Sequence, residues 1–345
     1  MTKNKYNQFE KRKNEHLILA LKKGTEAYGA TGLNKITLIH EALPNINFKD
    51  IKINTQIFGY KKRNPFLVSS MTGGIQNSKK INEIIAEASQ EMDWFMGVGS
   101  QRRELTDPSA NNEWINIKKK YSKIKLLSNI GITQITGTKL STIKRLVEPI
   151  DATALFIHTN PLQECLQQEG TPNFKGTLSA LEKLCMNLNT PIILKETGCG
   201  FSSNTLHRLN DIGIYAVDIS GYGGTHWGRI EGIRNKELIH KKASSTFSTW
   251  GIPTIDSLMH ASTMKPNYKI WASGGVRTGL DAAKMIALGA EMIGFAKPIL
   301  KCALENTESI VTFMRQIEFE FKIALFCTGY DNINTFQHNN PWVKI

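Results

Sequence analysis

The chain has 345 residues and a formal net charge of +13 at pH 7, with 41% hydrophobic and 21% charged residues. This composition is typical of a globular protein with a sizeable core. The sequence contains no apolar run of about 18 residues or more, so no membrane span is expected. Because the basic N-terminus also lacks an apolar segment of signal-peptide length, we expect a cytoplasmic protein without a membrane partner.

The basic charge calls for negatively charged partners. Lysine and arginine are spread along the whole chain, and no nucleic-acid-binding motif accompanies them. We therefore expect phosphorylated small molecules rather than nucleic acid, and a nucleic-acid-binding protein stays as a remote alternative. The five cysteines are scattered and form no C-x-x-C pair, so neither disulfides nor a zinc site is expected.

Short apolar runs recur along the chain, and each ends in a polar or glycine-rich stretch. Such runs, without strict alternation, are typical of parallel strands that are buried on both faces. The eight runs begin at Pro65, Trp94, Ile124, Ala154, Pro191, Tyr215, Lys269 and Met292. Helix-length segments separate most of them, for example residues 81–92, 138–150, 177–188 and 279–290.

Eight such β-α units predict a TIM (β/α)8 barrel of the α/β class. The gap between the sixth and seventh runs is unusually long, which predicts a long loop after strand six. We expect a single domain over residues 1–345. It would consist of an N-terminal extension (1–60), a barrel core (61–300) and a C-terminal helical segment (301–345).

Active sites of this fold lie at the C-terminal ends of the strands. The predicted strand ends carry mostly neutral hydrogen-bonding groups, and they lack both a Ser-His-Asp arrangement and a pair of free carboxylates. In chain order they offer Ser70, Met71, Thr72, Ser100, Gln101, Arg102, Asn129, His158, Asn160, Gln163, Glu164, Lys195, Ser220 and Thr225.

The last two strand ends carry the sequences "SGGVR" (273–277) and "AKP" (296–298). Glycine lets backbone N–H groups approach an oxyanion, and Arg277 can add a bidentate contact. Loops after strands seven and eight often bind phosphate in this fold, so a phosphate site is favoured over an ordinary strand-to-helix turn.

A ring of neutral groups around a phosphate site suits a flat polar heterocycle such as flavin mononucleotide. Lys195 would then stabilise the reduced flavin, or it forms a structural ion pair with Asp218. Glu164 could hold Mg²⁺ together with a diphosphate, or it is a carboxylate favoured by a helix start. The basic cluster of Arg12, Lys13 and His16 is either a solvated tail or a lid that binds phosphate.

Several motifs in this order resemble those of the type 2 isopentenyl-diphosphate Δ-isomerases, flavin-dependent enzymes of isoprenoid biosynthesis. The resemblance runs over about residues 12 to 300. The motifs that carry it are "RKNEH", "SSMTGG", "GSQR", "SNIG", "NPLQE", "KETGCGFS", "DISGYGGTHW" and "SGGVR". The chain departs from the family pattern at Thr159, Cys199, His226 and Lys297.

The resemblance implies a set of roles. FMN would be held by Ser70, Met71, Thr72, Ser100, Asn129, Lys195, Ser220 and Thr225, and its phosphate by Gly275, Val276, Arg277, Ala296 and Lys297. The substrate would be bound by Arg12, Lys13, His16, Ser100, Gln101, Arg102, His158, Asn160, Gln163 and Trp227. Glu164 would bind Mg²⁺, and the catalytic residues would be Gln163, Lys195 and His158. The family is typically a homo-oligomer, often a tetramer or octamer.

The activity so implied converts isopentenyl diphosphate into dimethylallyl diphosphate by reduced-flavin-mediated proton addition and removal, with NADPH needed only to reduce the flavin. The alternative within enzymes is an FMN-dependent 2-hydroxy-acid oxidase or dehydrogenase, which shares the barrel and the phosphate loops. Such enzymes need a histidine base and an arginine pair at the late strand ends. The sequence has Arg277 but no histidine beside "SGGVR".

Overall fold

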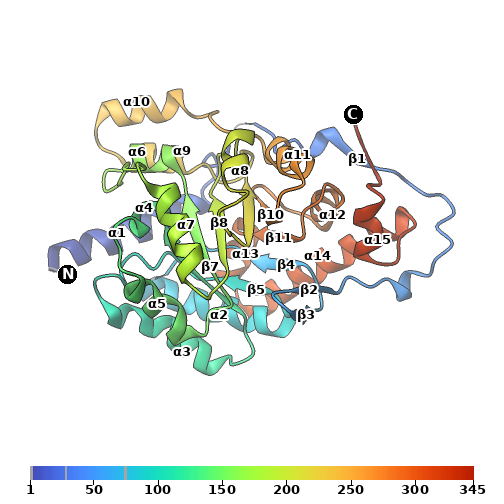
Figure 1. Ribbon diagram of the computed structural model, residues 1–345, viewed down its shortest axis with the longest axis horizontal. Helices are drawn as coiled ribbons and strands as arrows, with labels where there is room; N and C mark the ends of the chain where they lie inside the picture. Colours follow the sequence, from blue (N-terminus) through green and yellow to red (C-terminus); the bar gives the residue numbers. More distant parts are fainter. Residues whose placement is uncertain (1–2, 28, 74–75) are drawn as a thin grey trace.

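The computed structural model describes residues 3–27, 29–73 and 76–345. Its centre is a closed barrel of eight parallel strands, which confirms the predicted fold class (Figure 1). Each of the eight apolar runs contains one strand. In chain order the strands are β4 (Phe66–Val68), β5 (Phe95–Gly97), β6 (Leu126–Gly131), β7 (Ala154–Thr159), β8 (Ile192–Glu196), β9 (Ala216–Ser220), β10 (Lys269–Ser273) and β11 (Met292–Phe295).

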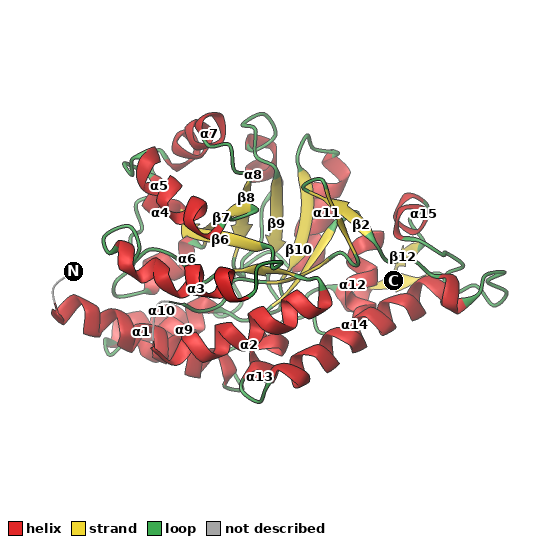
Figure 2. Ribbon diagram, turned by 90° about the horizontal axis from the view of Figure 1, so that it is seen from below, coloured by secondary structure: helices red, strands yellow, loops and turns green. Residues whose placement is uncertain are grey.

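The strands are apolar throughout because both of their faces are covered. One set of side chains, among them Leu67, Phe95, Phe156 and Trp271, fills the barrel interior. The other set faces a surrounding layer of helices, which Figure 2 shows around the yellow strands. The main covering helices are α2 (Gln76–Met92), α3 (Asn112–Lys120), α5 (Leu140–Val147), α7 (Thr177–Asn187), α8 (Ser203–Arg208), α11 (Thr254–Met264), α12 (Gly279–Ala287) and α14 (Thr307–Cys327).

Helix α14 is the eighth helix of the barrel, and it lies in the segment predicted as C-terminal and helical (301–345). It contacts α12 on one side and α2 on the other, and so it closes the helical layer. Its buried residues Met314, Ile317 and Phe321 recur at helical spacing and join the main core. The short helices α13 (Lys297–Ala303) and α15 (Ile333–His338) flank it.

The N-terminal end of the barrel is closed by a hairpin of β2 (Thr55–Ile57) and β3 (Tyr60–Lys62). Its two-residue turn, Phe58 and Gly59, has left-handed φ angles of 51° and 78°. The Phe58 ring stacks on Tyr215 with centroids 4.4 Å apart, and it also contacts Phe95 and Trp271 edge-on. The Phe58 side chain therefore fills the N-terminal end of the barrel.

The C-terminal end is partly covered by α1 (Lys3–Leu21), which contacts α9 (Trp227–Arg234) and α13. Leu19 and Ala20 of α1 pack with Ile230 and Trp227 of α9 in a small apolar cluster. This contact anchors the N-terminal extension over the barrel. The extension also reaches the chain end, because β1 (Ile36–Leu38) pairs antiparallel with β12 (Trp342–Lys344).

The predicted long loop after strand six is largely helical. It contains α9 and α10 (Leu238–Thr246) ahead of α11. Helix α9 starts where the His226 ring accepts a hydrogen bond from the backbone N–H of Arg229. The remaining elements are α4 (Ile132–Ile135), α6 (Pro161–Leu166) and four 3₁₀ turns at Leu33–Lys35, Phe48–Asp50, Pro108–Asn111 and Glu148–Ile150.

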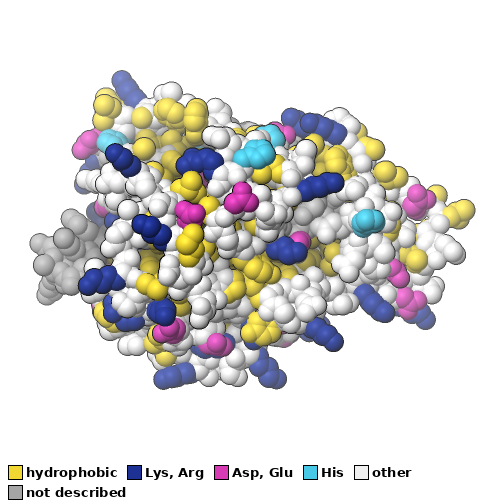
Figure 3. Space-filling view, in the orientation of Figure 1, with side chains coloured by type: hydrophobic (Ala, Val, Ile, Leu, Met, Phe, Trp, Pro, Cys, Tyr) yellow, Lys and Arg dark blue, Asp and Glu magenta, His cyan; other side chains and the backbone are white. Residues whose placement is uncertain are grey.

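Within the described residues, no helix has the length and apolar character needed to cross a bilayer. Figure 3 shows lysine and arginine side chains scattered over one face of the molecule rather than gathered in one patch. This face therefore offers no continuous basic track of the kind that binds a nucleic-acid backbone.

Candidate active site

A cavity opens at the C-terminal end of the barrel beneath α1. Almost all of the predicted site residues line it, although they come from segments spread over the whole sequence. Those in the lining are Arg12, Lys13, His16, Ser70, Met71, Thr72, Ser100, Arg102, Asn129, His158, Gln163, Glu164, Lys195, Ser220, Thr225, Trp227, Gly275, Val276, Arg277, Ala296 and Lys297.

Two predicted substrate-binding residues, Gln101 and Asn160, do not line the cavity. Gln101 is fully buried: its amide nitrogen donates to Asn111 Oδ1 and Leu146 O at 3.2 Å, and its oxygen accepts from the Asn129 N–H. Asn160 caps α6 by accepting from the Gln163 N–H at 2.9 Å, and it donates to Thr197. Both side chains position their neighbours, and neither belongs to the cavity lining.

The loop after β10 has the conformation that its two glycines predict. Gly274 and Gly275 have φ angles of 94° and 78°, a region that favours glycine. Within the described residues, the N–H groups of Gly275 and Val276 donate to no backbone or side-chain acceptor. Arg277 and Lys297 line the same end of the cavity. This end offers free N–H donors and two cations, which is the chemistry of an anion site.

The loop after β4 presents buried hydroxyl groups without partners. Within the part of the chain that the structure describes, Ser69 Oγ, Ser70 Oγ and Thr72 Oγ1 form no hydrogen bond, although all three residues line the cavity. Buried polar atoms are normally hydrogen-bonded, so these hydroxyls fit a site that is completed by a polar ligand. A Cβ atom on Gly99 would lie 2.3 Å from the Thr72 carbonyl, so glycine there lets the neighbouring loop approach closely.

Lys195 forms the ion pair with Asp218 that the sequence left open, and it also lines the cavity. Its ammonium group lies 2.6 Å from Asp218 Oδ2 and 2.7 Å from Ser273 Oγ. Ser273 in turn donates to Asp218 Oδ1 at 2.7 Å, and all three side chains are buried. The triangle holds the Lys195 charge at a fixed point of the cavity wall.

Arg12, Lys13 and Arg102 form a second cationic group, between α1 and the loop after β5. None of the three forms an ion pair with a carboxylate in the part of the chain that the structure describes. Burial, and then the neighbouring charge of Arg12, lower the pKa of the Lys13 ammonium to about 8. Partly buried cations without a counter-ion are costly unless an anion joins them, so this end also fits an anionic ligand.

His158 lies at the end of β7, where its Nδ1 is 2.9 Å from Asn129 Oδ1. The Asn129 amide nitrogen donates to Val98 O, which directs its oxygen toward the ring. His158 Nδ1 therefore carries the hydrogen and donates. Burial, and then the charges of Lys13, Lys195 and Arg102, lower the pKa of His158 to about 4, so the ring is neutral at pH 7.

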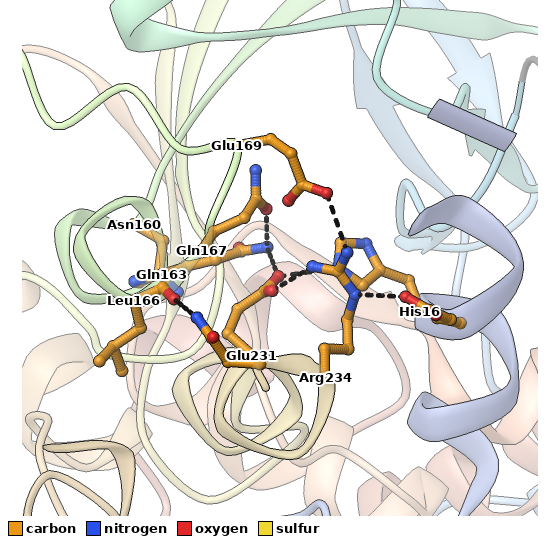
Figure 4. A network of polar contacts seen from close by, with 10 residues as sticks. His16, Asn160, Gln163, Leu166, Gln167, Glu169, Glu231 and Arg234 are labelled. Carbon is orange, nitrogen blue, oxygen red and sulfur yellow. Dashed lines mark hydrogen bonds and ion pairs between the residues drawn. The ribbon is translucent and has the colours of Figure 1, made fainter. Parts of the chain in front are cut away.

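A polar network around Glu231 links α1, α6 and α9 (Figure 4). His16 Nε2 lies 2.7 Å from Glu231 Oε1, and Gln163 Nε2 lies 3.3 Å from the same oxygen. Arg234 pairs with Glu231 and reaches Glu15 at 3.0 Å. Burial alone would raise the pKa of the Glu231 carboxyl, but the hydrogen bond from His16 and the charge of Arg234 lower it overall.

Glu231 is the main residue that the sequence analysis missed. The signal was its place one helical turn after Trp227, which puts the two side chains on one face of a helix. His16 contacts both of them, since its ring packs edge-on against Trp227 at 5.2 Å. The network thus fixes the orientation of Gln163 and of the α1 residues at the cavity.

Glu164 lines the cavity through the first turn of α6. Its Oε2 accepts a hydrogen bond from the Thr171 N–H at 2.6 Å. Within the described residues, no group of three or more His, Cys, Asp or Glu side chains could hold a metal ion. A cation at Glu164 would therefore need most of its oxygen ligands from a bound anion and from water, an arrangement that suits Mg²⁺.

Comparisons with known proteins place this site in a family. A model described as FMN-dependent dehydrogenase matches residues 151–342. A Legionella pneumophila (strain Corby) protein named isopentenyl-diphosphate delta-isomerase is 51% identical over 94% of this chain and 96% of its own length. A Bdellovibrio bacteriovorus protein of the same name is 48% identical over 96% of both chains. The chain belongs to the FMN-dependent isopentenyl-diphosphate delta-isomerase family.

Solved structures that resemble the chain share its fold at low identity. A mandelate oxidase variant with a monooxide FMN adduct has a TM-score of 0.65 at 14% identity, covering 96% of this chain and 98% of its own. A flavocytochrome b2 variant with bound pyruvate has a TM-score of 0.69 at 16% identity, covering 99% of this chain and 85% of its own. At this low identity the similarities show the barrel fold alone, so the chemistry has to be inferred from the residues of the site.

The residues present fit the flavin that the family description implies. The partnerless hydroxyls of Ser69, Ser70 and Thr72 suit a polar ring system, and the free N–H groups after β10 suit its phosphate. Lys195 supplies a fixed positive charge in the cavity wall.

The triangle of Lys195, Asp218 and Ser273 gives a stability prediction. Replacing Asp218 by Asn leaves a buried ammonium without its counter-ion, and we expect a loss of about 3–5 kcal/mol in the free energy of unfolding. Urea denaturation of the flavin-free protein measures it. The double variant Lys195→Met with Asp218→Asn removes both charges and should recover much of the loss. Equal losses in the single and the double variant would contradict the argument.

Proposed function

We propose that this chain converts isopentenyl diphosphate into dimethylallyl diphosphate on bound, reduced FMN. The single observation that carries the proposal is a cavity with two separate cationic ends. One end is the pair Arg277 and Lys297, which share the carboxylate of Glu26, and the other is the cluster of Arg12, Lys13 and Arg102. A flavin phosphate and a substrate diphosphate need two such ends at once. Membership in the isomerase family supports the same conclusion.

At the cofactor end, the proposed ligands of FMN are the predicted ones. Ser70, Thr72 and Asn129 would hydrogen-bond the ring, and the N–H groups of Gly275 and Val276 with Arg277 would bind the phosphate. Lys195 would place a positive charge beside the ring. The chemistry that reduced FMN supplies when bound is the addition of one proton to the alkene and the removal of another, without net redox change. NADPH would serve to reduce the flavin.

At the substrate end, Arg12, Lys13 and Arg102 would hold the diphosphate, and Glu164 would reach it through Mg²⁺. Neutral His158 offers Nε2 as an acceptor, because Nδ1 donates to Asn129. Binding of an anion beside the ring would favour a second proton on it and turn Nε2 into a donor. The prenyl group would lie against Trp227 and Leu17, which line the cavity from α9 and α1.

Gln163 is the polar group that we propose to act nearest the reacting carbons. Its backbone N–H is fixed by Asn160, and its side-chain amide contacts Gln167 and Glu231, both at 3.3 Å. The network leaves Gln163 little rotational freedom, so it can orient the alkene or pass a proton toward Glu231. We further propose that the enzyme is a cytoplasmic homo-oligomer.

The decisive experiment is an anaerobic assay of isopentenyl diphosphate with FMN, NADPH and Mg²⁺, repeated with the flavin left oxidised. We expect dimethylallyl diphosphate only when the flavin is reduced. A 2-hydroxy acid, such as mandelate or lactate, should not reduce the bound flavin. Flavin reduction by a hydroxy acid, without isomerisation of the diphosphate, would overturn the proposal in favour of an oxidase or dehydrogenase.

The depressed pKa of Lys13 predicts an alkaline limit to substrate binding. In the free enzyme the Lys13 side chain is charged below about pH 8, and it loses its proton and its charge as the pH rises through that value. We expect kcat/KM to fall up to about tenfold per pH unit above that value, with a smaller effect on kcat. In Lys13→Arg the charge persists, so the alkaline limb should move to higher pH. An unchanged limb would show that another group causes it.

The role of Glu164 is tested by Glu164→Gln, which removes the charge but keeps an oxygen that can accept from the Thr171 N–H. We expect kcat/KM to fall by roughly 10-fold or more and the residual rate to lose its dependence on Mg²⁺. Steady-state rates over a Mg²⁺ titration provide the measurement. Wild-type activity with intact Mg²⁺ dependence would rule out a metal role for this carboxylate.

A further inference from the structure

Two described stretches of the N-terminal extension, residues 25–27 and 29–33, lie beside the proposed phosphate end of the cavity. The backbone of the first is bonded to the loop after β9: Ala27 N–H donates to Gly224 O at 2.8 Å, and His226 N–H donates to Thr25 O at 2.9 Å. The side chain of Arg229 also donates to the Glu26 carbonyl. These contacts fix where the backbone of Glu26 sits relative to the phosphate loops.

Farther along, Thr31 contacts the glycine-rich loops after β9 and β10. Thr31 lies so close that a Cβ atom on Gly275 would be 2.3 Å from its methyl carbon, and one on Gly223 would be 2.5 Å from it. The Thr31 carbonyl accepts from the Ile255 N–H at 3.0 Å. The second stretch is thus built into the phosphate end rather than lying loosely beside it.

The side chain of Glu26 pairs with both cations at this end. One carboxylate oxygen, Oε1, lies 3.1 Å from Arg277 Nη2 and 3.2 Å from Lys297 Nζ. Partial burial alone would raise the pKa of Glu26, but the hydrogen bond from Lys297 and the charge of Arg277 lower it overall. The carboxylate is therefore ionised at neutral pH, and it binds the two side chains proposed to receive the FMN phosphate.

The two cationic ends of the cavity differ in this respect. Within the described residues, Arg12, Lys13 and Arg102 have no carboxylate partner, whereas Arg277 and Lys297 share one. Glu26 is also 38% exposed at its side chain, so a rotation about its side-chain bonds can carry the carboxylate into solvent without moving the backbone. The two cations at the phosphate end are therefore paired with a carboxylate of this chain, and a ligand can displace that carboxylate.

We infer that Glu26 is an internal counter-ion that competes with the FMN phosphate for Arg277 and Lys297, and so sets the affinity and selectivity of the cofactor site. A phosphate dianion makes several charge-assisted hydrogen bonds and can displace one carboxylate, whereas weaker anions cannot. The inference rests on the proposed FMN site.

The test compares flavin binding to the full-length chain freed of flavin, using quenching of flavin fluorescence. In Glu26→Gln the competitor loses its charge, and we expect the Kd for FMN to fall roughly three- to tenfold. Glu26→Ala should act in the same direction. Riboflavin has the same ring but no phosphate, so its Kd should not change. The difference for FMN should shrink as salt is raised from about 0.05 to about 0.5 M.

Glu91→Gln is the matched control, because Glu91 forms an exposed ion pair with Arg315 away from the cavity. Weaker or unchanged FMN binding in Glu26→Gln would overturn the inference, since Glu26 would then hold the two cations in place or do nothing. Equal changes for FMN and riboflavin would also overturn it. If the unmodified chain bound neither flavin, the proposed cofactor itself would fall, and the inference with it.

Discussion

Closure of the barrel is the constraint on which the rest of this structure depends. Hydrogen bonding of β11 to β4 completes the ring of eight parallel strands, so all eight C-terminal ends meet at one rim. The hairpin of β2 and β3 fills the opposite end with Phe58. Groups as far apart in sequence as Ser70 and Lys297 therefore face one cavity.

The charges around this cavity are managed in three different ways. Lys195 is held in place by a buried ion pair with Asp218 inside the barrel. Arg12 and Lys13 have no carboxylate partner among the described residues, at a cost that an anionic ligand can offset. Arg277 and Lys297 form ion pairs with the partly exposed Glu26, which we propose that a ligand can replace. The same residue types thus serve as fixed, open and exchangeable positive charges.

Helix α1 forms one wall of the proposed substrate end of the cavity. Its apolar residues Leu19 and Ala20 pack on Ile230 of α9, and its His16 joins the Glu231 network. The same helix carries Arg12 and Lys13 to the cavity, so packing and ligand chemistry are coupled through one element. Solved barrels with TM-scores near 0.65 share the fold at 14% identity, which agrees with chemistry that resides in the rim rather than in the barrel.

The sequence by itself determined the barrel, its eight strands and most of the cavity lining. Strands buried on both faces leave continuous apolar runs, and the polar residues behind each run must reach the rim of a closed barrel. The phosphate loop was equally legible, because Gly274 and Gly275 adopt left-handed angles that other residues avoid. The family motifs added the roles of residues that spacing alone left open, such as Glu164.

Only the tertiary structure decided which polar side chains remain free for a ligand. Gln101 and Asn160 lie near strand ends just as Ser100 and His158 do, yet their side-chain amides donate to Asn111 and Thr197. The pairing of β1 with β12, the docking of α1, and the positions of Glu231 and Glu26 join segments separated by some 200 residues or more. Local sequence patterns report periodicity and burial, but contacts between distant segments depend on how the whole chain packs.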